Sequence, residues 1–295
     1  MSDVLAVLCS DLHLSERCPT ARAEKDNWLD VQASYLNQLG DLSKKHRAPI
    51  VCAGDIFDRW NPPISFVNWV VAHIPKMYAI PGQHDLPYHR MERIGDTAFW
   101  NLVENGRIDC IREGGMERGG LMLWGFPWGV GLHSLKDTED GNSDLFNLAV
   151  CHRYIWAGNK KYPGAPQDAH AGKLIDYLDG YDASVFGDNH KGFIFGNVLN
   201  CGTFLRRKRD EIEYVPQVGL LRRKGIEIVE LDTSKDLWME ETIVSEHEYD
   251  MSALMQELSN EAYDSLDFEE AARKELSKIS KPAQELLLKA LEGSK

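Results

Sequence analysis

Short apolar runs alternate with longer, more polar segments over roughly the first two thirds of the chain. Five of these runs are four to six residues long and mostly rich in Val, Ile, Leu, Phe or Cys, at 4–9, 50–53, 77–80, 148–151 and 183–186. Runs of this length and composition are typical of strands buried on both faces. The segments between them predict helices, at 24–45, 63–74, 96–104 and 168–179. The alternation predicts a layered α/β domain.

The pattern changes after residue 190. Three further apolar segments follow one another without an intervening helix, at 192–199, 212–221 and 225–231. They predict a second, more antiparallel sheet. Beyond them, three segments have helical character, at 253–260, 267–277 and 282–291. We therefore expect a large domain at 1–235, a linker at 236–251 and a small helical segment at 252–295.

Each of the five buried runs ends in residues that commonly bind metals or carry protons. These residues are Asp11 and His13, Asp55 and Asp58, Gln83, His84 and Asp85, His152, and Asp188 and His190. The ends of neighbouring strands meet at one edge of a sheet, where open α/β sheets place their sites. A single cluster of this kind has an ordinary explanation, such as a capped strand end or a buried histidine. Five in succession predict a metal centre.

Three of the clusters have spacings that suit metal ions. Asp11 and His13 are two residues apart, and side chains two apart in an extended segment share a side. The glycine before Asp55 permits a tight turn and leaves a carboxylate whose two oxygens can bridge two ions. The pair of Gln83 and His84 offers an amide oxygen ligand with an imidazole nearby.

Overall charge argues mildly against a nucleic-acid surface that covers the whole protein, because the net charge of the 295 residues is −13. Two basic blocks stand out, at 206–209 and 222–224, and each is either a solvated loop or a set of phosphate contacts. No apolar run approaches the ~18 residues of a membrane span. No basic segment precedes the first strand, so we expect no signal peptide and a cytoplasmic location.

The cysteines do not change this picture. Six are present, without C-x-x-C spacing. Three of them, Cys9, Cys52 and Cys151, fall in predicted buried strands close to the candidate ligands. We expect small apolar fillers in a reducing cytosol, with thiolate ligation as the lesser alternative.

In their order, these clusters resemble the motifs of the calcineurin-like metallophosphoesterases, which run Asp-x-His, Gly-Asp, Gly-Asn-His, His and Gly-His-x-His. Within that superfamily the chain is similar to the SbcD family of double-strand-break repair nucleases, which has phage members. The similar segments are AGDIFDRWNPP at 53–63, IPGQHDLPYHR at 80–90 and NCGTFLRRKRDE at 200–211. The resemblance covers roughly residues 3–231. It implies a four-layer αββα sandwich whose catalytic domain is the large domain at 1–235, followed by the small helical segment.

The resemblance also implies a role for each candidate residue. One ion would be held by Asp11, His13, Asp55 and His190, and a second by Asp55, Gln83, His152 and Asp188. His84 would lie beside the scissile phosphate, as general acid or charge stabiliser, and Asp85 would orient it. The expected substrate contacts are Asp58, Arg59, His89, Arg90, Arg206 and Arg207. Asp58 has two further explanations, an anchor behind the ligands or a cap of the turn.

Two positions depart from the family pattern. Gln83 stands where the family usually has Asn, and Asp188 stands where it usually has His. The second ion would then have three oxygen donors and one nitrogen. Because hard oxygen ligands favour Mn²⁺ or Mg²⁺ over zinc, we expect two divalent ions, Mn²⁺ first and Mg²⁺ as the alternative.

These roles imply a DNA nuclease, exonuclease or endonuclease, active in DNA repair or recombination. Hydrolysis would proceed by direct attack of a metal-activated hydroxide on the phosphodiester. A small-molecule phosphodiesterase or phosphatase on the same core is the alternative. A DNA-binding module with a decayed site is a third. Trp60 and Tyr88 either stack on unpaired bases or pack in the core and its rim.

The resemblance extends to partners. The C-terminal helices would dock on an SbcC-like ATPase or pack on their own domain. A homodimer would form through helices near the second cluster, with 63–74 contributing. The protein would act in a cytoplasm, including that of a host cell if it is phage-encoded.

Overall fold

The computed structural model describes residues 3–111, 114–137, 145–158 and 165–239. The chain divides into two compact units, Met1–Met239 and Glu240–Lys295, and the described residues all belong to the first. The three predicted C-terminal helices and most of the predicted linker therefore lie outside the described residues.

The first sheet has six strands in the order β12-β11-β1-β2-β3-β4. Their bounds are β1 Val4–Cys9, β2 Ile50–Cys52, β3 Met77–Ala79, β4 Ile108–Cys110, β11 Gln217–Arg222 and β12 Gly225–Glu230. Strands β1 to β4 are parallel, and β11 and β12 are antiparallel additions beside β1. The parallel strands are connected by the helices α1 Trp28–His46, α2 Ile64–His73 and α3 Ala98–Glu104. Parallel neighbours need such crossovers, which explains the alternation in the sequence.

The second sheet also has six strands, in the order β5-β6-β7-β8-β10-β9. Their bounds are β5 Met116–Arg118, β6 Leu121–Phe126, β7 Phe146–His152, β8 Ala183–Gly187, β9 Phe193–Phe195 and β10 Val198–Asn200. Strands β6, β7, β8 and β10 are parallel, with β5 and β9 antiparallel at the two edges. Helix α4, Ala171–Leu174, precedes β8.

Short 3₁₀ helices complete the described structure. They are η1 Gln83–Asp85, η2 Pro87–His89, η3 Met91–Asp96, η4 Leu135–Asp137, η5 Gln167–Ala169, η6 Ile175–Leu178 and η7 Arg209–Glu211. The helix predicted at 168–179 is therefore α4 flanked by η5 and η6. Across the described residues, no helix is both long enough and apolar enough to cross a membrane.

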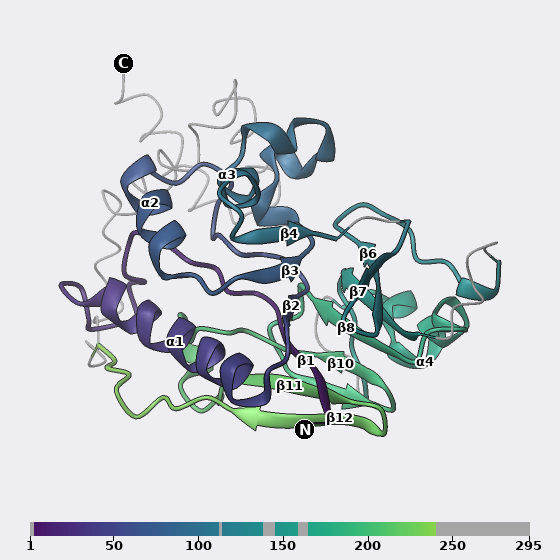
Figure 1. Ribbon diagram of the computed structural model, residues 1–295. Coiled ribbons are helices and arrows are strands. Elements are labelled where there is room, and N and C mark those ends of the chain that lie inside the picture. Colours follow the sequence, from purple (N-terminus) through teal and green to yellow (C-terminus); the bar gives the residue numbers. More distant parts are fainter. Residues whose placement is uncertain (1–2, 112–113, 138–144, 159–164, 240–295) are drawn as a thin grey trace, which may run out of the picture. The chain divides into compact units, whose positions relative to one another are not determined.

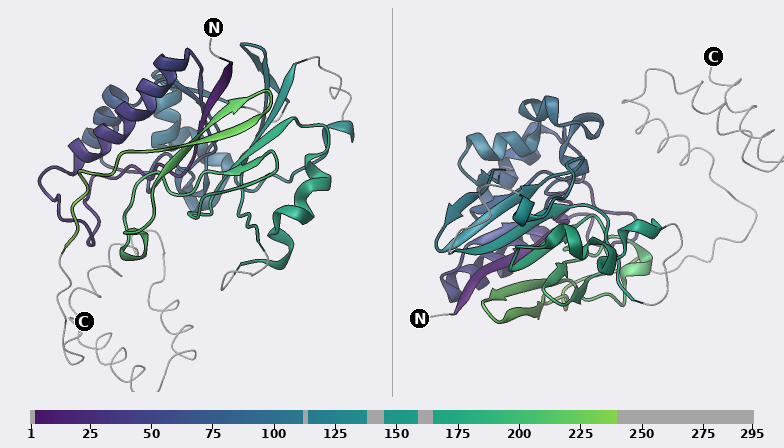
Figure 2. Two further views of the ribbon diagram at one scale, coloured as in Figure 1. Left: turned by 90° about the horizontal axis from the view of Figure 1, so that it is seen from below. Right: turned by 90° about the vertical axis from the view of Figure 1, so that its right-hand side faces the viewer.

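Four layers follow from the alternation of side chains along the buried strands. In β1, Val7 and Cys9 pack into the core beneath α1, α2 and α3, whereas Ala6 and Leu8 pack against the second sheet. The outer face of the second sheet packs against α4 through side chains such as Phe186. Figure 1 shows α1, α2 and α3 on one side of the two sheets and α4 on the other, and the left view of Figure 2 agrees. The predicted αββα sandwich is confirmed.

The predicted second sheet is wrong in its membership. The strands after residue 190 do not form a sheet of their own, because β9 and β10 extend the second sheet and β11 and β12 extend the first. The strand predicted at 192–199 is a hairpin that turns at Gly196, whose φ is 58°. Strands β4, β5 and β6 were not predicted, since no candidate ligand marks their ends. The ligand-bearing strands also belong to two sheets rather than one.

Candidate metal centre

Strained backbone marks the ends of the ligand-bearing strands. Four candidate ligands adopt left-handed backbone, with φ values of 51° at Asp11, 43° at His13, 53° at Asp55 and 83° at Asp188. Residues with a Cβ seldom adopt this conformation, because it costs energy that the surrounding structure must offset. These tight turns direct the side chains after β1, β2 and β8 towards one another. Such strain is common at functional sites.

Close approach of the two sheets depends on glycine. At Gly54, φ is 95°, and a Cβ would lie 2.5 Å from Nδ1 of His152 and 2.8 Å from the backbone nitrogen of Gly82. Any larger residue would push the loop after β2 away from the end of β7. The Gly-Asp pair thus brings Asp55 and His152 together across the two sheets.

We define Asp11, His13 and His190 as the first half-site. Their ligand atoms all lie within 4.8 Å of one another. Nε2 of His13 is 3.1 Å from Nε2 of His190 and 3.9 Å from Oδ1 of Asp11. Burial lowers the pKa of His190 to about 4 and also lowers the pKa of His13. Both imidazoles are therefore neutral at neutral pH, which is the form that binds metals.

Gln83, His152 and Asp188 form what we define as the second half-site. Nδ1 of His152 donates to the Ala53 carbonyl at 2.6 Å, which leaves Nε2 to face the site. Nε2 of Gln83 donates to Oδ1 of Asp188 at 2.9 Å, which leaves the amide oxygen free. Both remaining atoms, Nε2 of His152 and Oε1 of Gln83, are buried without a hydrogen-bond partner. These hydrogen bonds therefore orient the His152 ring and the Gln83 amide, but they leave the two ligand atoms themselves without a partner.

Asp55 lies between the half-sites. Its Oδ2 is 3.6 Å from Nε2 of His13 and 3.4 Å from Nε2 of His152, and it has no hydrogen-bond partner. Although burial alone would raise the pKa of Asp55, the His152 imidazole holds it below its ordinary value. The carboxylate is therefore ionised and faces both sides.

Protonation differs between the other buried groups. Burial raises the pKa of Asp11 to about 7. Burial would lower the pKa of His152, but the Asp55 carboxylate outweighs it and raises that pKa to about 10. Without a cation, His152 therefore carries a proton at neutral pH.

The donor set fits divalent cations. Unpaired buried atoms on Asp55, Gln83 and His152 would otherwise leave costly unmet polar groups. Asp11, Asp55 and His152 also have ligand atoms within 4.8 Å of one another, so Asp11 is within reach of both half-sites. Imidazoles mixed with carboxylate and amide oxygens suit first-row divalent ions.

Asp85 does not orient His84, contrary to expectation. Both Asp85 oxygens accept backbone N–H groups, from Phe57 at 3.0 Å, from Gly82 at 3.0 Å and from Ile56 at 3.2 Å. Nδ1 of His84 instead lies 2.8 Å from the carbonyl oxygen of Asp58. Asp85 thus links the loops after β2 and β3 by accepting hydrogen bonds from their backbone N–H groups.

The prediction that Arg206 contacts the substrate is wrong. It is 8% exposed, and it donates to Oδ2 of Asp236 at 2.8 Å and to the Ile212 carbonyl at 2.7 Å. Asp236 also forms an ion pair with Arg22, whose side chain is fully buried. Arg206 is therefore part of a buried ion network, which its position in a basic run could not indicate.

The remaining predicted contacts divide into three groups. Arg207 reaches Oδ1 of Asp58 at 2.6 Å, beside the candidate ligands. Arg59 is paired with Glu16 instead. His89 and Arg90 are exposed on the loop that follows His84.

The second basic block, at 222–224, lies far from these residues. Arg222 pairs with Val4 at the start of β1, whereas the candidate ligands follow its end. Its side chain bonds Asp3 and Glu227. This block is a solvated turn between β11 and β12.

Several positioning groups were not predicted. The Ser10 hydroxyl donates to Oδ2 of Asp11 at 2.5 Å, and the Asp188 N–H donates to Oδ1 of the same carboxylate at 2.9 Å. The Asn200 amide donates to the Asn189 carbonyl at 2.6 Å, which secures the loop before His190. A buried Asn at a strand end was the one sequence signal for these contacts.

Buried cysteines behave as fillers. Cys9, Cys52, Cys151 and Cys201 are buried free thiols. Burial raises the pKa of Cys151 and of Cys201, which keeps those thiols protonated. Protonated thiols do not serve as metal ligands.

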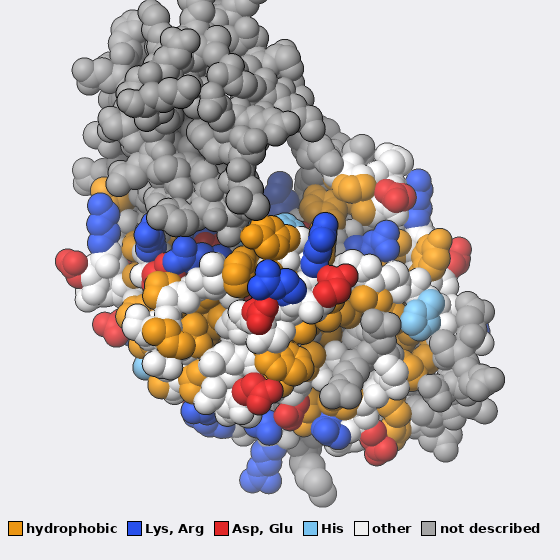
Figure 3. Space-filling model, turned by 90° about the horizontal axis from the view of Figure 1, so that it is seen from above, with side chains coloured by type: hydrophobic (Ala, Val, Ile, Leu, Met, Phe, Trp, Pro, Cys, Tyr) orange, Lys and Arg blue, Asp and Glu red, His pale blue; other side chains and the backbone are white. Residues whose placement is uncertain are grey.

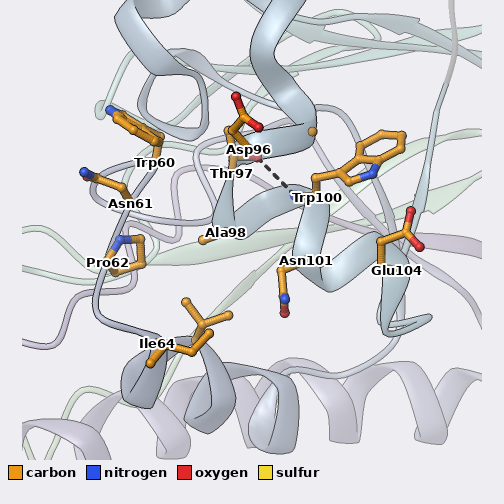
Figure 4. Close-up of a pocket in the computed structure, with 12 residues that line it drawn as sticks. Trp60, Asn61, Pro62, Ile64, Asp96, Thr97, Ala98, Trp100, Asn101 and Glu104 are labelled. Atoms are coloured by element: carbon orange, nitrogen blue, oxygen red, sulfur yellow. Dashed lines mark hydrogen bonds between the residues drawn. The ribbon is translucent and has the colours of Figure 1, made fainter.

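A pocket of about 410 Å³ lies beside the loop after β2. Trp60 lines one side of it and Trp100 the other, with Asp96, Thr97 and Ala98 between them (Figure 4). Trp60 is thus a half-buried rim residue rather than a core residue. Tyr88 is 57% exposed.

Charge on one visible face is mixed. On the part of this face that the grey atoms leave in view, Lys and Arg side chains are interspersed with Asp and Glu (Figure 3). A nucleic acid would therefore meet local cations on this face rather than a continuous basic stripe.

Two solved structures show a distant likeness to this chain. The crystal structure of TT1561 of Thermus thermophilus has a TM-score of 0.44 and 15% identity, over 77% of this chain and 99% of that one. An archaeal phosphodiesterase has a TM-score of 0.40 and 11% identity, over 77% and 99%. No curated protein matches the sequence.

A protein-family model does match. The model described as calcineurin-like phosphoesterase covers residues 5–192, which include all the candidate ligands. The αββα layers and the ligand geometry agree with that match. The chain belongs to the calcineurin-like phosphoesterases, a family of metal-dependent hydrolases of phosphoester bonds.

Proposed function

We propose that this protein is a DNA nuclease that uses two divalent ions, Mn²⁺ in preference to Mg²⁺, to hydrolyse phosphodiester bonds. The observation that carries the hydrolytic part is the set of three unpaired buried atoms on Asp55, Gln83 and His152. Asp55 and Gln83 belong to the segments at 53–63 and 80–90 that resemble the SbcD family. Ions bound there would polarise the phosphate and activate water for in-line attack.

The chain's own residues support that chemistry by holding ligands and protons in place. The Ala53 carbonyl fixes the tautomer of His152, and Gln83 fixes one oxygen of Asp188. His84 donates Nδ1–H to the Asp58 carbonyl, so Nε2 must also be protonated before it can give a proton to the leaving oxygen. The loop that carries His84 is anchored by Asp85.

Support for DNA as the substrate comes from the surface beyond His84. Tyr88, His89 and Arg90 are all exposed there. Tyr88 and His89 have φ values of 52° and 60°, and such strained backbone is common at binding loops. An exposed aromatic beside an arginine suits single-stranded nucleic acid, which is bound by stacking and by phosphate contacts.

A small-molecule phosphodiesterase is the second candidate. The net charge of −13 favours it, because such a charge would not concentrate a polyanion at the site. Docking of an SbcC-like ATPase and formation of a homodimer remain predictions.

Cleavage of end-labelled single- and double-stranded DNA with Mn²⁺ tests the proposal, with bis(p-nitrophenyl) phosphate assayed in parallel. We expect the wild type to cut DNA and the His84→Ala variant to lose most of that activity. The matched control is His73→Ala, an exposed histidine at the end of α2. Turnover of the small diester without any DNA cleavage would refute the nuclease and favour the second candidate.

A further inference from the structure

Only one residue of the basic block at 206–209 reaches the candidate metal centre. Arg206 is buried in the ion network with Asp236. Arg209 donates to the Met239 carbonyl. Lys208 is exposed, with its backbone N–H on Glu211 at 2.9 Å. Within the block, Arg207 alone bonds Asp58, which lies beside His13 of the centre.

Its side chain lies at the edge of the first half-site. Arg207 Nη1 is 2.6 Å from Oδ1 of Asp58, and the same oxygen is 3.7 Å from Nδ1 of His13. The Arg207 side chain is 20% exposed, so it is reachable from solvent. Its Nε is buried without a hydrogen-bond partner. A guanidinium with an unused donor therefore lies beside the ligands.

The backbone on both sides of Arg207 is held rigidly. Its own N–H donates to Oε2 of Glu211 at 2.5 Å. Earlier in the loop, Phe204 N–H donates to the Asp11 carbonyl at 3.1 Å, and Thr203 N–H donates to the His190 carbonyl at 3.1 Å. The loop is thereby tied to two ligands of the first half-site, which fixes where the guanidinium can reach.

We propose that Arg207 binds the two non-bridging oxygens of the substrate phosphate, and that Asp58 holds the guanidinium in place until the phosphate displaces it. The inference rests on the proposed phosphoester hydrolysis and does not depend on DNA being the substrate. The planar fork of Arg suits two oxygens of one phosphate, and Asp58 supplies the carboxylate that such a fork binds when phosphate is absent. Arg59 belongs to the same loop as Asp58, but it is paired with Glu16 and so does not supply this phosphate contact.

Binding of inorganic phosphate to the Mn²⁺-loaded protein, measured by calorimetry, tests the proposal. We expect Arg207→Met to weaken phosphate binding by about tenfold or more, because one charge-assisted contact is lost. Arg207→Lys should be intermediate, because it keeps the charge and loses the fork. The matched control is Arg223→Met, an exposed residue between β11 and β12 that should leave phosphate affinity unchanged.

Asp58→Asn tests the second half of the proposal. Removal of the competing carboxylate should tighten phosphate binding, and the gain should vanish in the Arg207→Met background. A gain that persists in the double variant would show a general charge effect and overturn the role of Asp58. Thermal unfolding and the number of bound Mn²⁺ ions, measured for every variant, should match the wild type.

Phosphate affinity in Arg207→Met equal to that of Arg223→Met would overturn the role of Arg207. So would Arg207→Lys with wild-type affinity, since that would exclude a fork contact. Phosphate is a product of phosphomonoester hydrolysis and a probe for any phosphoester site. A protein that fails to cut DNA but loses phosphate affinity in Arg207→Met would refute the nuclease and support this inference.

Discussion

The two half-sites of the metal centre are prepared for a cation in different ways. In the first, His13 and His190 are kept neutral by burial, and their Nε2 atoms lie 3.1 Å apart. In the second, His152 is fixed by the Ala53 carbonyl and carries a proton, because Asp55 stabilises the charged ring. The first half-site is thus ready to bind without losing a histidine proton, whereas the second must lose one.

This difference follows from where each half-site lies in the fold. His152 ends β7, where the two sheets approach through Gly54, so it faces the ionised Asp55 directly. His190 lies three residues beyond β8 and is farther from that carboxylate than Nε2 of His13, which is 3.6 Å away. Oδ2 of Asp55 lies within 3.6 Å of Nε2 of His13 and within 3.4 Å of Nε2 of His152, which makes Asp55 the natural test of the comparison.

Asp55→Ala should have the largest effect, because it removes the shared carboxylate. We expect loss of Mn²⁺ from both half-sites and no detectable hydrolysis of any phosphoester. Mn²⁺ binding by calorimetry and turnover of bis(p-nitrophenyl) phosphate would measure it. Retention of two tightly bound ions would show that Asp55 does not link the half-sites.

His84→Ala should have the next largest effect while sparing both half-sites. Loss of a general acid typically costs about 10²- to 10⁴-fold in rate. The expected result is a fall of that size in kcat with both ions still bound. A variant that loses an ion as well as activity would instead place His84 among the ligands, where its approach to His13 and Asp58 would allow it.

pH should separate the half-sites. His152, with a pKa of about 10, must release its proton to bind metal, so Mn²⁺ affinity at the second half-site should rise by about tenfold per pH unit around pH 7.5 to 8.5. At the first half-site, His190 has a pKa of about 4 and Asp11 one of about 7, so affinity there should be nearly constant over that range. Calorimetry in buffers of different ionisation enthalpy would count the protons released. Equal pH dependence of the two binding steps would contradict the comparison.

Asp188→His should have the smallest effect, because it should change the metal preference of the second half-site rather than the activity. A nitrogen donor in place of an oxygen favours zinc, so the ratio of Zn²⁺ to Mn²⁺ affinity at the second half-site should rise. Competition between the two ions would measure it. An unchanged ratio would show that the oxygen-rich donor set does not decide the metal.

The ligand-bearing strands could be predicted because they are buried on both faces. Runs such as Val4–Cys9 and Ala183–Gly187 are mostly apolar, and their ends mark the site directly. Membership of β11 and β12 could not be predicted, since pairing of Leu221 with Ala6 depends on contacts 215 residues apart in the chain. Sheet partners are set by long-range packing, which periodicity does not encode.

The candidate ligands could be predicted as a set, but their supporting contacts could not. The hydrogen bond from His152 to Ala53 and the use of Asp85 as a backbone anchor arise only when loops from different strands meet. Arg206 and Arg207 are neighbours of identical type, yet one is buried in an ion network and the other reaches Asp58. Local sequence cannot separate them, because the direction of each side chain is fixed by the loop they share.

The most direct test of the account is the number of Mn²⁺ ions bound by metal-free protein, titrated by calorimetry in the wild type, His190→Ala and His152→Ala. We expect two ions in the wild type and one in each variant. The remaining site in His190→Ala should show the steep pH dependence, and the one in His152→Ala should not. One ion in the wild type, or two in either variant, would contradict a centre built from two half-sites that share Asp55.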